Sequence, residues 1–407
     1  MAFAALKGWT PVAKHTVAAS YLAWTLDAYD FFLLVFVFKD IAAQFGTSIT
    51  QVAFAVTLTL ACRPIGAFLF GRLADNFGRR PVLMLDIACY SILSFAIAFT
   101  PNIYAFYIAC GCFGVAMGGV WGIAASLSME ASKPQSRGLV SGLLQSGYYS
   151  GYLVAALVYG FAYASIGWRG MFMVGVVPAL LLIVYIYSSV PESQHFNREQ
   201  ARANPTFSVL AKHWKIAIYA ILLMTAYTFF SHGTQDLYPT FLQVQHHYGP
   251  ATVKNIAVIY NIGAIIGSLT FGTISQSLGR RRTAITIALL SLPVVYLWAY
   301  STTPVMLALG AFLIQVCVGG AWGVVPAHLN ELSPASARGT FPGTVYQLGN
   351  LIASVNAVLQ AGIAERMGGN YSIALASVAV CAALAIVTLL KFGPEAHGVE
   401  MGHATTH

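Results

Sequence analysis

The chain has 407 residues, of which 58% are hydrophobic and 8% charged, with a formal net charge of +8. This composition excludes a water-soluble protein of two or three domains, because so few charged residues cannot cover a soluble surface. Nucleic-acid binding is not expected despite the positive charge, because the basic residues lie in short segments between apolar runs. We therefore expect a protein that spans a lipid bilayer many times.

Apolar stretches recur along the whole chain, and each can cross a hydrocarbon core of roughly 30 Å with about 20 helical residues. Continuous apolar runs favour helices over a barrel of alternating strands. A polar segment, 191–214, divides them into two sets of six. The predicted fold class is an all-α membrane protein with 12 transmembrane helices: 15–40, 51–74, 81–100, 104–130, 136–163, 168–190, 215–243, 253–277, 283–301, 304–331, 336–364 and 370–392.

The basic residues predict the orientation of these helices. Sixteen of the 21 Lys and Arg residues fall on the side of the N-terminus: Lys7, Lys14, Arg72, Arg79, Arg80, Lys133, Arg137, Arg198, Arg202, Lys212, Lys215, Arg280, Arg281, Arg282, Arg338 and Lys391. Four fall on the other side: Lys39, Arg169, Lys254 and Arg366. This bias predicts a bacterial-type inner (plasma) membrane protein with both termini and segment 191–214 in the cytoplasm.

The chain also repeats itself at an offset of 201 residues. The run Gly118-Gly119-Val120-Trp121-Gly122 returns as Gly319-Gly320-Ala321-Trp322-Gly323, and Glu130 returns as Glu331. We therefore expect two halves of six helices, 1–190 and 215–407, joined by a cytoplasmic linker, 191–214. Halves of this kind bind their cargo near the middle of the bilayer, at the interface between them.

One loop motif supports this architecture. The run 71–80, GRLADNFGRR, lies between the second and third predicted helices and has an echo at 272–281. It resembles the loop signature of the major facilitator superfamily. The resemblance covers essentially the whole chain and implies the major facilitator fold.

A narrower resemblance lies in the first and seventh helices. The run 24–32, WTLDAYDFF, is similar to the first-helix motif of the sialate:proton symporter family. The run 231–236, SHGTQD, with Thr240 further on, is similar to the seventh-helix signature of the lactate and carboxylate permeases of that family. Thr228 stands where that signature has Asn. The resemblance implies transport of an organic acid together with protons.

Four side chains are candidates for proton coupling, because charged groups inside a bilayer are expensive unless they have a function or a partner. Asp27 and Asp30 lie three residues apart on one predicted helix, and a carboxyl in an apolar cavity can load and release a proton near neutral pH. A helix–helix hydrogen bond is the alternative. His232 and Asp236 lie four residues apart and share a helix face. They form a protonatable unit, or else a network that only stabilises the outer end of their helix.

Arg63 lies deep in the second predicted helix, where a permanent cation needs an anion. It either captures a substrate carboxylate through two hydrogen bonds or forms a fixed ion pair with Asp27 or Asp30. Other polar residues in apolar runs are candidates for the same substrate site, with helix packing as the alternative for each: Gln145, His232, Gln347, Tyr29, Asn261 and Asn350. We expect no metal site, because the six cysteines lie in apolar segments without ligand spacing, and no cofactor.

A second set of charged residues is predicted to form a network at the inner face that holds one conformational state. Its members are Asp75, Arg79, Arg80, Glu130, Arg137, Glu331 and Arg338.

The sequence therefore predicts a monomeric proton-coupled symporter that imports a small organic anion, with lactate or another short monocarboxylate as the leading candidate. Sialic acid or an aromatic acid is the alternative cargo. A non-transporting membrane sensor is the alternative from another class, although no soluble signalling domain is present in the sequence. The chain has no G-x-x-x-x-G-K-[ST] nucleotide-binding loop and no catalytic constellation, so an enzyme is not expected.

Overall fold

The computed structural model of the chain describes residues 9–47, 49–193, 212–334, 337 and 340–394. Helices make up all the regular structure in this part, apart from one short 3-10 turn, η1 (Pro134–Ser136). The first half contains α2 (Pro11–Phe36), α3 (Phe38–Phe45), α4 (Ile49–Phe77), α5 (Arg79–Ile97), α6 (Ile103–Met117), α7 (Val120–Glu130), α8 (Arg137–Val174) and α9 (Val176–Ser189).

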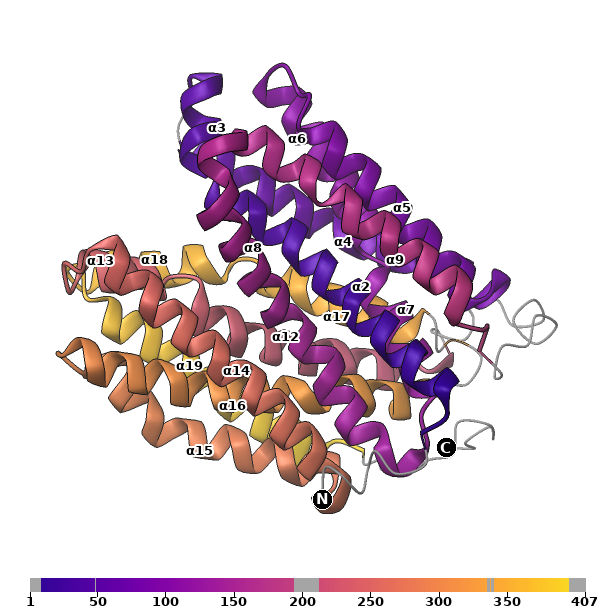
Figure 1. The fold of residues 1–407 in the computed structure, drawn as a ribbon. Coiled ribbons are helices and arrows are strands. Elements are labelled where there is room, and N and C mark those ends of the chain that lie inside the picture. Colours follow the sequence, from indigo (N-terminus) through magenta and orange to yellow (C-terminus); the bar gives the residue numbers. More distant parts are fainter. Residues whose placement is uncertain (1–8, 48, 194–211, 335–336, 338–339, 395–407) are drawn as a thin grey trace.

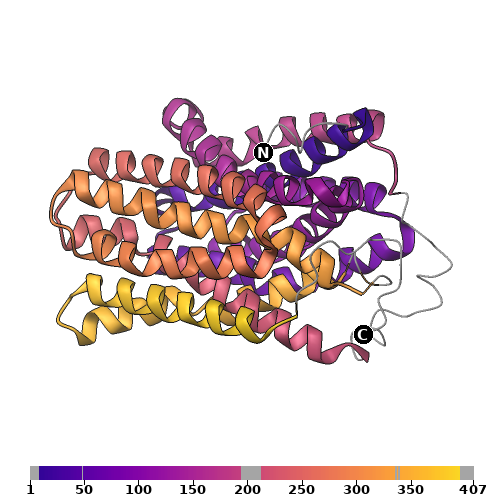
Figure 2. The same cartoon turned by 90° about the horizontal axis from the view of Figure 1, so that it is seen from below.

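The second half repeats this order with fewer interruptions. It contains α12 (Trp214–Gln235), α13 (Tyr238–Val244), α14 (Pro250–Leu278), α15 (Arg280–Tyr300), α16 (Pro304–Leu332), α17 (Phe341–Ala353), α18 (Asn356–Arg366) and α19 (Tyr371–Phe392). Figure 1 shows the helices of the first half, in indigo and magenta, beside those of the second half, which run from rose through orange to yellow. Figure 2 shows the same two groups from below.

These helices correspond to the twelve predicted crossings, with differences in detail. The fifth and sixth predicted helices overlap in α8, which bends at Gly167, where φ is 62°. Glycine tolerates this positive φ because it has no side chain to clash with the neighbouring backbone. Short interruptions fall inside the first, fourth, sixth, seventh and eleventh predicted helices. In the fourth, between α6 and α7, Gly118 and Gly119 keep helical φ and ψ values.

Nine stretches within the described residues are long and apolar enough to cross a membrane. The crossings that fall outside this set are α2, the first part of α8, and α17 with α18. Each of them carries buried polar groups, among them Asp27 on α2, Gln145 on α8 and Gln347 on α17. These polar residues lower the hydropathy of helices that face other helices rather than lipid.

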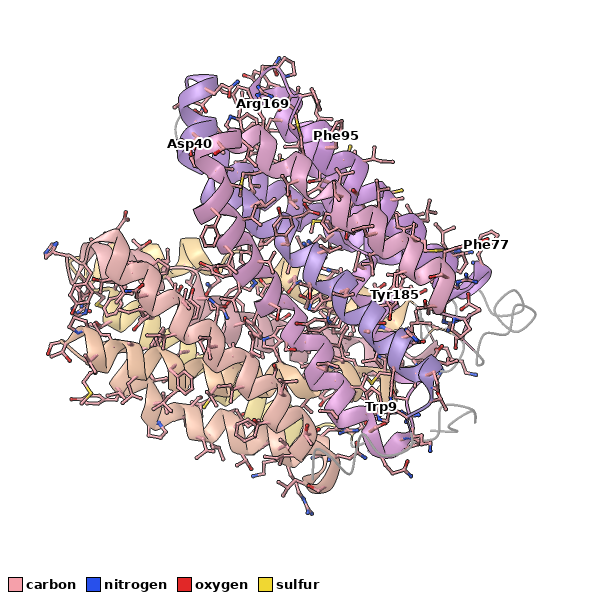
Figure 3. The ribbon with its side chains drawn as sticks, viewed as in Figure 1. Trp9, Asp40, Phe77, Phe95, Arg169 and Tyr185 are labelled. Carbon is pink, nitrogen blue, oxygen red and sulfur yellow. The ribbon has the colours of Figure 1, made fainter. Side chains whose placement is uncertain are left out.

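The bundle has two chemically different ends. Figure 3 places Phe77 and Tyr185 near one end and Asp40 and Arg169 near the other. The first of these we call the basic end, because α5 and α15 both begin there with consecutive arginines. Its placement in the cytoplasm stays a prediction. So does the division at residues 190 and 215, and linker residues 194–211 lie outside the described part of the chain.

The two halves approach closely where α8 packs on α14. A Cβ atom added at Gly142 would lie 2.2 Å from the backbone oxygen of Ser268, and one at Gly272 would lie 2.7 Å from the Cα of Gly142. Only glycine fits at such a helix–helix contact. The glycine pair therefore brings the two backbones together near the basic end.

Candidate substrate and proton site

Arg63 and Asp27 form a buried ion pair in the core of the first half. Arg63 Nη2 lies 3.4 Å from Asp27 Oδ2, and the two side chains are 4% and 1% exposed. The guanidinium also stands over the ring of Phe31 and donates to the sulfur of Met117. The ion pair with Asp27, which was one of the two predicted roles of Arg63, is thus present in the structure. Asp27 Oδ1 and Arg63 Nε have no hydrogen-bond partner among the described residues, so the guanidinium retains a donor for a second anion.

Asp30 contacts a different helix, α5, although it lies on the same helix as Asp27. Its Oδ1 accepts a hydrogen bond of 3.1 Å from Ser94 on α5. Tyr29, beside it, packs in an apolar cluster with Leu33 and Met171, and its hydroxyl has no hydrogen-bond partner among the described residues. The two candidate aspartates of α2 therefore have different surroundings, and Asp27 is the one paired with a cation.

Asp86 on α5 is a further buried carboxyl of the first half, and no sequence motif predicts a role for it. It is 0% exposed, and neither of its oxygens has a hydrogen-bond partner in the described part of the chain. It lies within electrostatic range of Asp27 and Arg63. Its position inside a predicted membrane span was a usable signal in the sequence, because any aspartate in such a span is a candidate for function.

His232 and Asp236 contact each other as their spacing predicts. His232 Nδ1 lies 3.0 Å from Asp236 Oδ1, and the side chains are 27% and 32% exposed. The amide of Asn356 on α18 donates to Asp236 Oδ2 at 3.3 Å, and Gln360 donates to the backbone oxygen of Gly233 at 2.7 Å. The pair is therefore held by α18 and remains partly open, at the end of α12 opposite the basic end.

A chain of neutral polar groups lies in the second half. Thr228 donates to Asn350 Oδ1 at 2.8 Å, and the amide of Asn350 donates to Gln347 Oε1 at 3.0 Å. The Gln347 amide nitrogen is buried and has no hydrogen-bond partner among the described residues. Thr228, the departure from the family signature, thus supports Asn350, which is one of the predicted site residues.

Aromatic side chains connect the two halves at this level. Trp121 Nε1 donates to Gln145 Oε1 at 3.3 Å, and its ring lies 4.5 Å from that of Tyr346. Trp322, the repeat of Trp121, packs on the same Tyr346 ring at 5.6 Å. Tyr346 is therefore enclosed by the equivalent tryptophans of both halves.

Several of these groups lie near the charge of Arg63. Tyr148, Tyr346 and His232 all lie within its electrostatic range. The structure thus brings Arg63, His232 and the polar groups around Tyr346 into one region between the halves. Asn261 is placed differently, because its amide donates to Ala257 of its own helix at 2.9 Å. The functional roles of all these residues stay predictions.

The predicted charge network is built around Arg79 at the basic end of the first half. Arg79 Nη2 lies 3.3 Å from Glu130 Oε1 and 3.6 Å from Asp75 Oδ1. Arg80 instead places its guanidinium on the backbone oxygen and the ring of Tyr187. The backbone N–H groups of Arg79 and Arg80 donate to the carboxylate of Glu192, which therefore caps the start of α5.

The second half has its own version of this network. Arg280 holds Glu331 through two hydrogen bonds of 3.0 and 3.1 Å, and both side chains are fully buried. Its position in the sequence predicts Arg280 only as a residue of the basic loop, whereas it is the repeat of Arg79 and the partner of Glu331. Arg137 is buried at the start of α8. Arg338 lies outside the described residues.

Three hydrogen bonds join the two halves at the basic end. The backbone N–H of Gly138 donates to Gln276 Oε1 at 3.1 Å, and that of Ala327 donates to Ser141 Oγ at 3.1 Å. The hydroxyl of Thr340, at the start of α17, donates to Asp75 Oδ2. Gln276 is the repeat of Asp75, so each half uses the same position of its loop motif to hold the other half.

We expect Thr340→Ala to loosen this end of the molecule. A hydrogen bond to a charged group contributes about 1.5–3 kcal/mol, so its loss should shift the closed-to-open ratio about 10-fold or more. The rate at which a thiol reagent modifies a cysteine at position 344, in a background without the six native cysteines, measures this shift. Thr388→Ala, which removes an exposed hydroxyl on α19, is the control. Equal modification rates in both variants would contradict a holding role for Thr340.

Comparison with known proteins identifies the family. The sequence model of the Major Facilitator Superfamily matches residues 20–253, and that of the sugar (and other) transporters matches residues 213–396. The first match covers more than half of the chain. This chain belongs to the Major Facilitator Superfamily. It is a multi-pass membrane transporter and not an enzyme, and the predicted 12-helix fold is confirmed.

Individual relatives are more distant. The chain is 28% identical over 374 residues to a carboxylic acid transporter protein homolog of Saccharomyces cerevisiae, across 85% of this chain and 60% of that protein. It therefore spans about 60% of that relative's length. It is 25% identical to the sialic acid transporter NanX of Escherichia coli, across 95% and 96% of the two chains. The solved structure of the proton:xylose symporter XylE has the same fold, with a TM-score of 0.74 at 19% identity and coverage of 96% and 98%.

Proposed function

We propose that this chain is a proton-coupled symporter that imports a small organic anion, with lactate or another short monocarboxylate as its cargo, by alternating access of its two halves. The observation that carries the proposal is the buried Arg63–Asp27 pair, which lies within range of Tyr346 and His232 of the other half. A guanidinium binds carboxylates through paired hydrogen bonds. A small carboxylate is therefore the ligand that this region is equipped to hold.

Charge balance supports coupling to a proton. A buried carboxylate that loses its partner costs several kcal/mol. When a substrate carboxylate takes Arg63 from Asp27, Asp27 must therefore bind a proton or remain as an uncompensated charge. One proton then enters the site with each anion. The reverse step, release of substrate, returns Arg63 to Asp27 and frees the proton.

Two relatives bear on the identity of the anion. The relatives described as a carboxylic acid transporter homolog and a sialic acid transporter both favour an organic acid. Sialic acid or an aromatic acid is the second candidate. The rings of Trp121 and Trp322 contact Tyr346 at tilted and edge-on angles, and such an aromatic group supports an aromatic acid as the second candidate. Membership of a transporter superfamily favours transport over the sensor alternative.

The orientation, the location and the monomeric state belong to the same proposal. We expect the basic end to face the cytoplasm of a bacterial-type inner membrane, with one chain sufficient for transport. The halves are tied together at that end, while His232 and Asp236 are partly exposed near the other. This arrangement fits a transporter whose site is reached from outside the cell.

Uptake by proteoliposomes under an imposed pH gradient tests the proposal. We expect an inward proton gradient to stimulate accumulation of labelled lactate, and unlabelled carboxylates to compete with it. A panel of lactate, sialic acid and an aromatic acid separates the candidate cargoes. Substrate exchange without any response to the gradient would overturn proton coupling and leave a uniporter or exchanger.

A further inference from the structure

Asp86 is the buried acid that the proposed mechanism leaves unused. Both carboxyl oxygens lack a hydrogen-bond partner in the described part of the chain, and the residue is 0% exposed. Isolated buried carboxylates are so unfavourable that proteins pair them or neutralise them. With Arg63 paired to Asp27, Asp86 has no cation of its own. The arrangement is therefore stable with a proton on Asp86.

The repeat shows that the fold does not need a carboxyl at this position. The residue 201 positions after Asp86 is Ile287, which is buried at 0% exposure in α15. An aliphatic side chain therefore occupies the corresponding position in the second half. A carboxyl that costs stability and is dispensable for packing points to a function in proton or ion handling.

Asp86 lies against the paired glycines of a neighbouring helix. A Cβ atom added at Gly119 would lie 2.4 Å from Asp86 Oδ2, so the carboxyl contacts the glycine backbone where α6 passes into α7. Gly118 and Gly119 keep right-handed helical φ and ψ values, and Ile103–Glu130 is one candidate membrane span. A larger residue at position 119 would therefore displace the carboxyl.

Several titratable groups surround Asp86. Asp27 on α2 and Arg63 on α4 lie within its electrostatic range, and its own helix adds Cys89 and Tyr90. The buried hydroxyl of Tyr90 lies within electrostatic range of both Asp27 and Asp86, and it is hydrogen-bonded to neither in the described structure. A hydroxyl can accept one proton and donate another. A route through Tyr90 is therefore part of the proposal, and it requires the hydroxyl to contact each carboxyl in turn.

The two carboxyls lie at different depths. Asp86 is the eighth residue of α5, which begins at the basic end, whereas Asp27 is the seventeenth residue of α2. A proton that moves from Asp27 to Asp86 therefore moves toward the expected cytoplasmic side.

We propose that Asp86 is a proton-relay residue, which takes the proton from Asp27 through Tyr90 when Arg63 returns to Asp27 and releases it toward the basic end. In this step the O–H bond of Asp27 breaks and an O–H bond on Asp86 forms, so Asp27 becomes the carboxylate that pairs with Arg63. Release of the proton leaves Asp86 as a carboxylate, which the next proton from Asp27 neutralises. The inference rests on the proposed symport and specifies the inward path of its proton.

Proteoliposomes carrying Asp86→Asn test the relay. Asn has the shape of the protonated acid and cannot release a proton. We expect substrate exchange at wild-type rate, whereas accumulation driven by a one-unit pH gradient falls from about tenfold to none, because one pH unit is worth about 1.4 kcal/mol per proton. Wild-type accumulation in this variant would overturn the relay. Loss of exchange together with accumulation would also overturn it and assign Asp86 to binding or folding.

A second pair of variants tests the route. Tyr90→Phe removes the connecting hydroxyl and should slow gradient-driven uptake while sparing exchange. Ser91→Ala removes a buried hydroxyl one position away, which also lacks a partner, and should leave both rates unchanged. Equal effects of the two substitutions would contradict a route through Tyr90.

A readout that does not depend on transport separates this inference from the proposed function. The infrared carbonyl band of a protonated carboxyl should be present in the wild-type protein and reduced in Asp86→Asn. If uptake by the wild-type protein does not respond to the pH gradient but the band is present, the symport proposal is wrong. The band would still support a proton on Asp86. An unchanged band in the variant would overturn the assignment of a proton to Asp86.

Discussion

Arg63→Lys is expected to weaken binding of the transported acid by about 10- to 100-fold. An ammonium group cannot reproduce the planar fork of donors, and a charge-assisted hydrogen bond contributes about 1.5–3 kcal/mol, with each 1.4 kcal/mol worth a factor of ten. The free donors of Arg63, including the unpartnered Nε, are the groups that a substrate carboxylate would use. Equilibrium binding to the purified protein, with the acid selected by the uptake panel, measures the change.

A matched control lies on the same helix. Arg72 is exposed, nine residues nearer the basic end, and Arg72→Lys should leave the affinity unchanged. Arg63→Gln removes the charge and should reduce binding further than Arg63→Lys does. An affinity for Arg63→Lys equal to that of Arg72→Lys would leave Arg63 as a fixed partner of Asp27 and remove it from the substrate site.

The architecture could be predicted from sequence because its signals are local or periodic. Apolar length indicates each helix, and the 201-residue repeat indicates the two halves. The contact between His232 and Asp236 follows from a spacing of four residues on one helix. These features depend on neighbours within the chain, so one sequence contains enough information to find them.

Contacts between helices could not be predicted in the same way. Whether Asp27 or Asp30 contacts Arg63 depends on how α2 is rotated against α4, and the sequence is compatible with either contact. Arg280 is one of three consecutive arginines that the sequence places in a loop, whereas its hydrogen bonds to Glu331 place its side chain in the core. Asp86 has no charged neighbour in sequence, so no local pattern predicts a role for it. Its burial in a membrane span is nevertheless as unusual as that of Asp27.

The symmetry between the halves is structural rather than chemical. Asp27, Arg63 and Asp86 of the first half correspond by the repeat to Thr228, Ala264 and Ile287 of the second. The first half thus holds the charged groups, and the second contributes the neutral chain from Thr228 to Gln347. Such a division suits a site in which one half handles protons and charge while the other recognises the rest of the cargo.

Asp27→Asn is expected to abolish gradient-driven accumulation and to preserve exchange. At one proton per anion, a one-unit pH gradient supports about tenfold accumulation, because each pH unit is worth about 1.4 kcal/mol per proton. Asn at position 27 cannot give up a proton when substrate leaves, so the expected accumulation ratio is about one. It also frees Arg63 from its partner, so binding of the acid should be retained or strengthened. Paired measurements of accumulation and counterflow in proteoliposomes test both parts.

Asp30→Asn is the comparison that makes this result specific. Asp30 lies on the same helix and is equally buried, but it bonds to Ser94 and has no contact with Arg63 in the described structure. If coupling depends on competition between substrate and a carboxyl for one guanidinium, Asp30→Asn should keep most of its accumulation while Asp27→Asn loses it. Equal loss in the two variants would mean that buried negative charge in α2, rather than the pairing with Arg63, sustains coupling. The competition mechanism would then have to be abandoned, even if both variants still exchanged substrate.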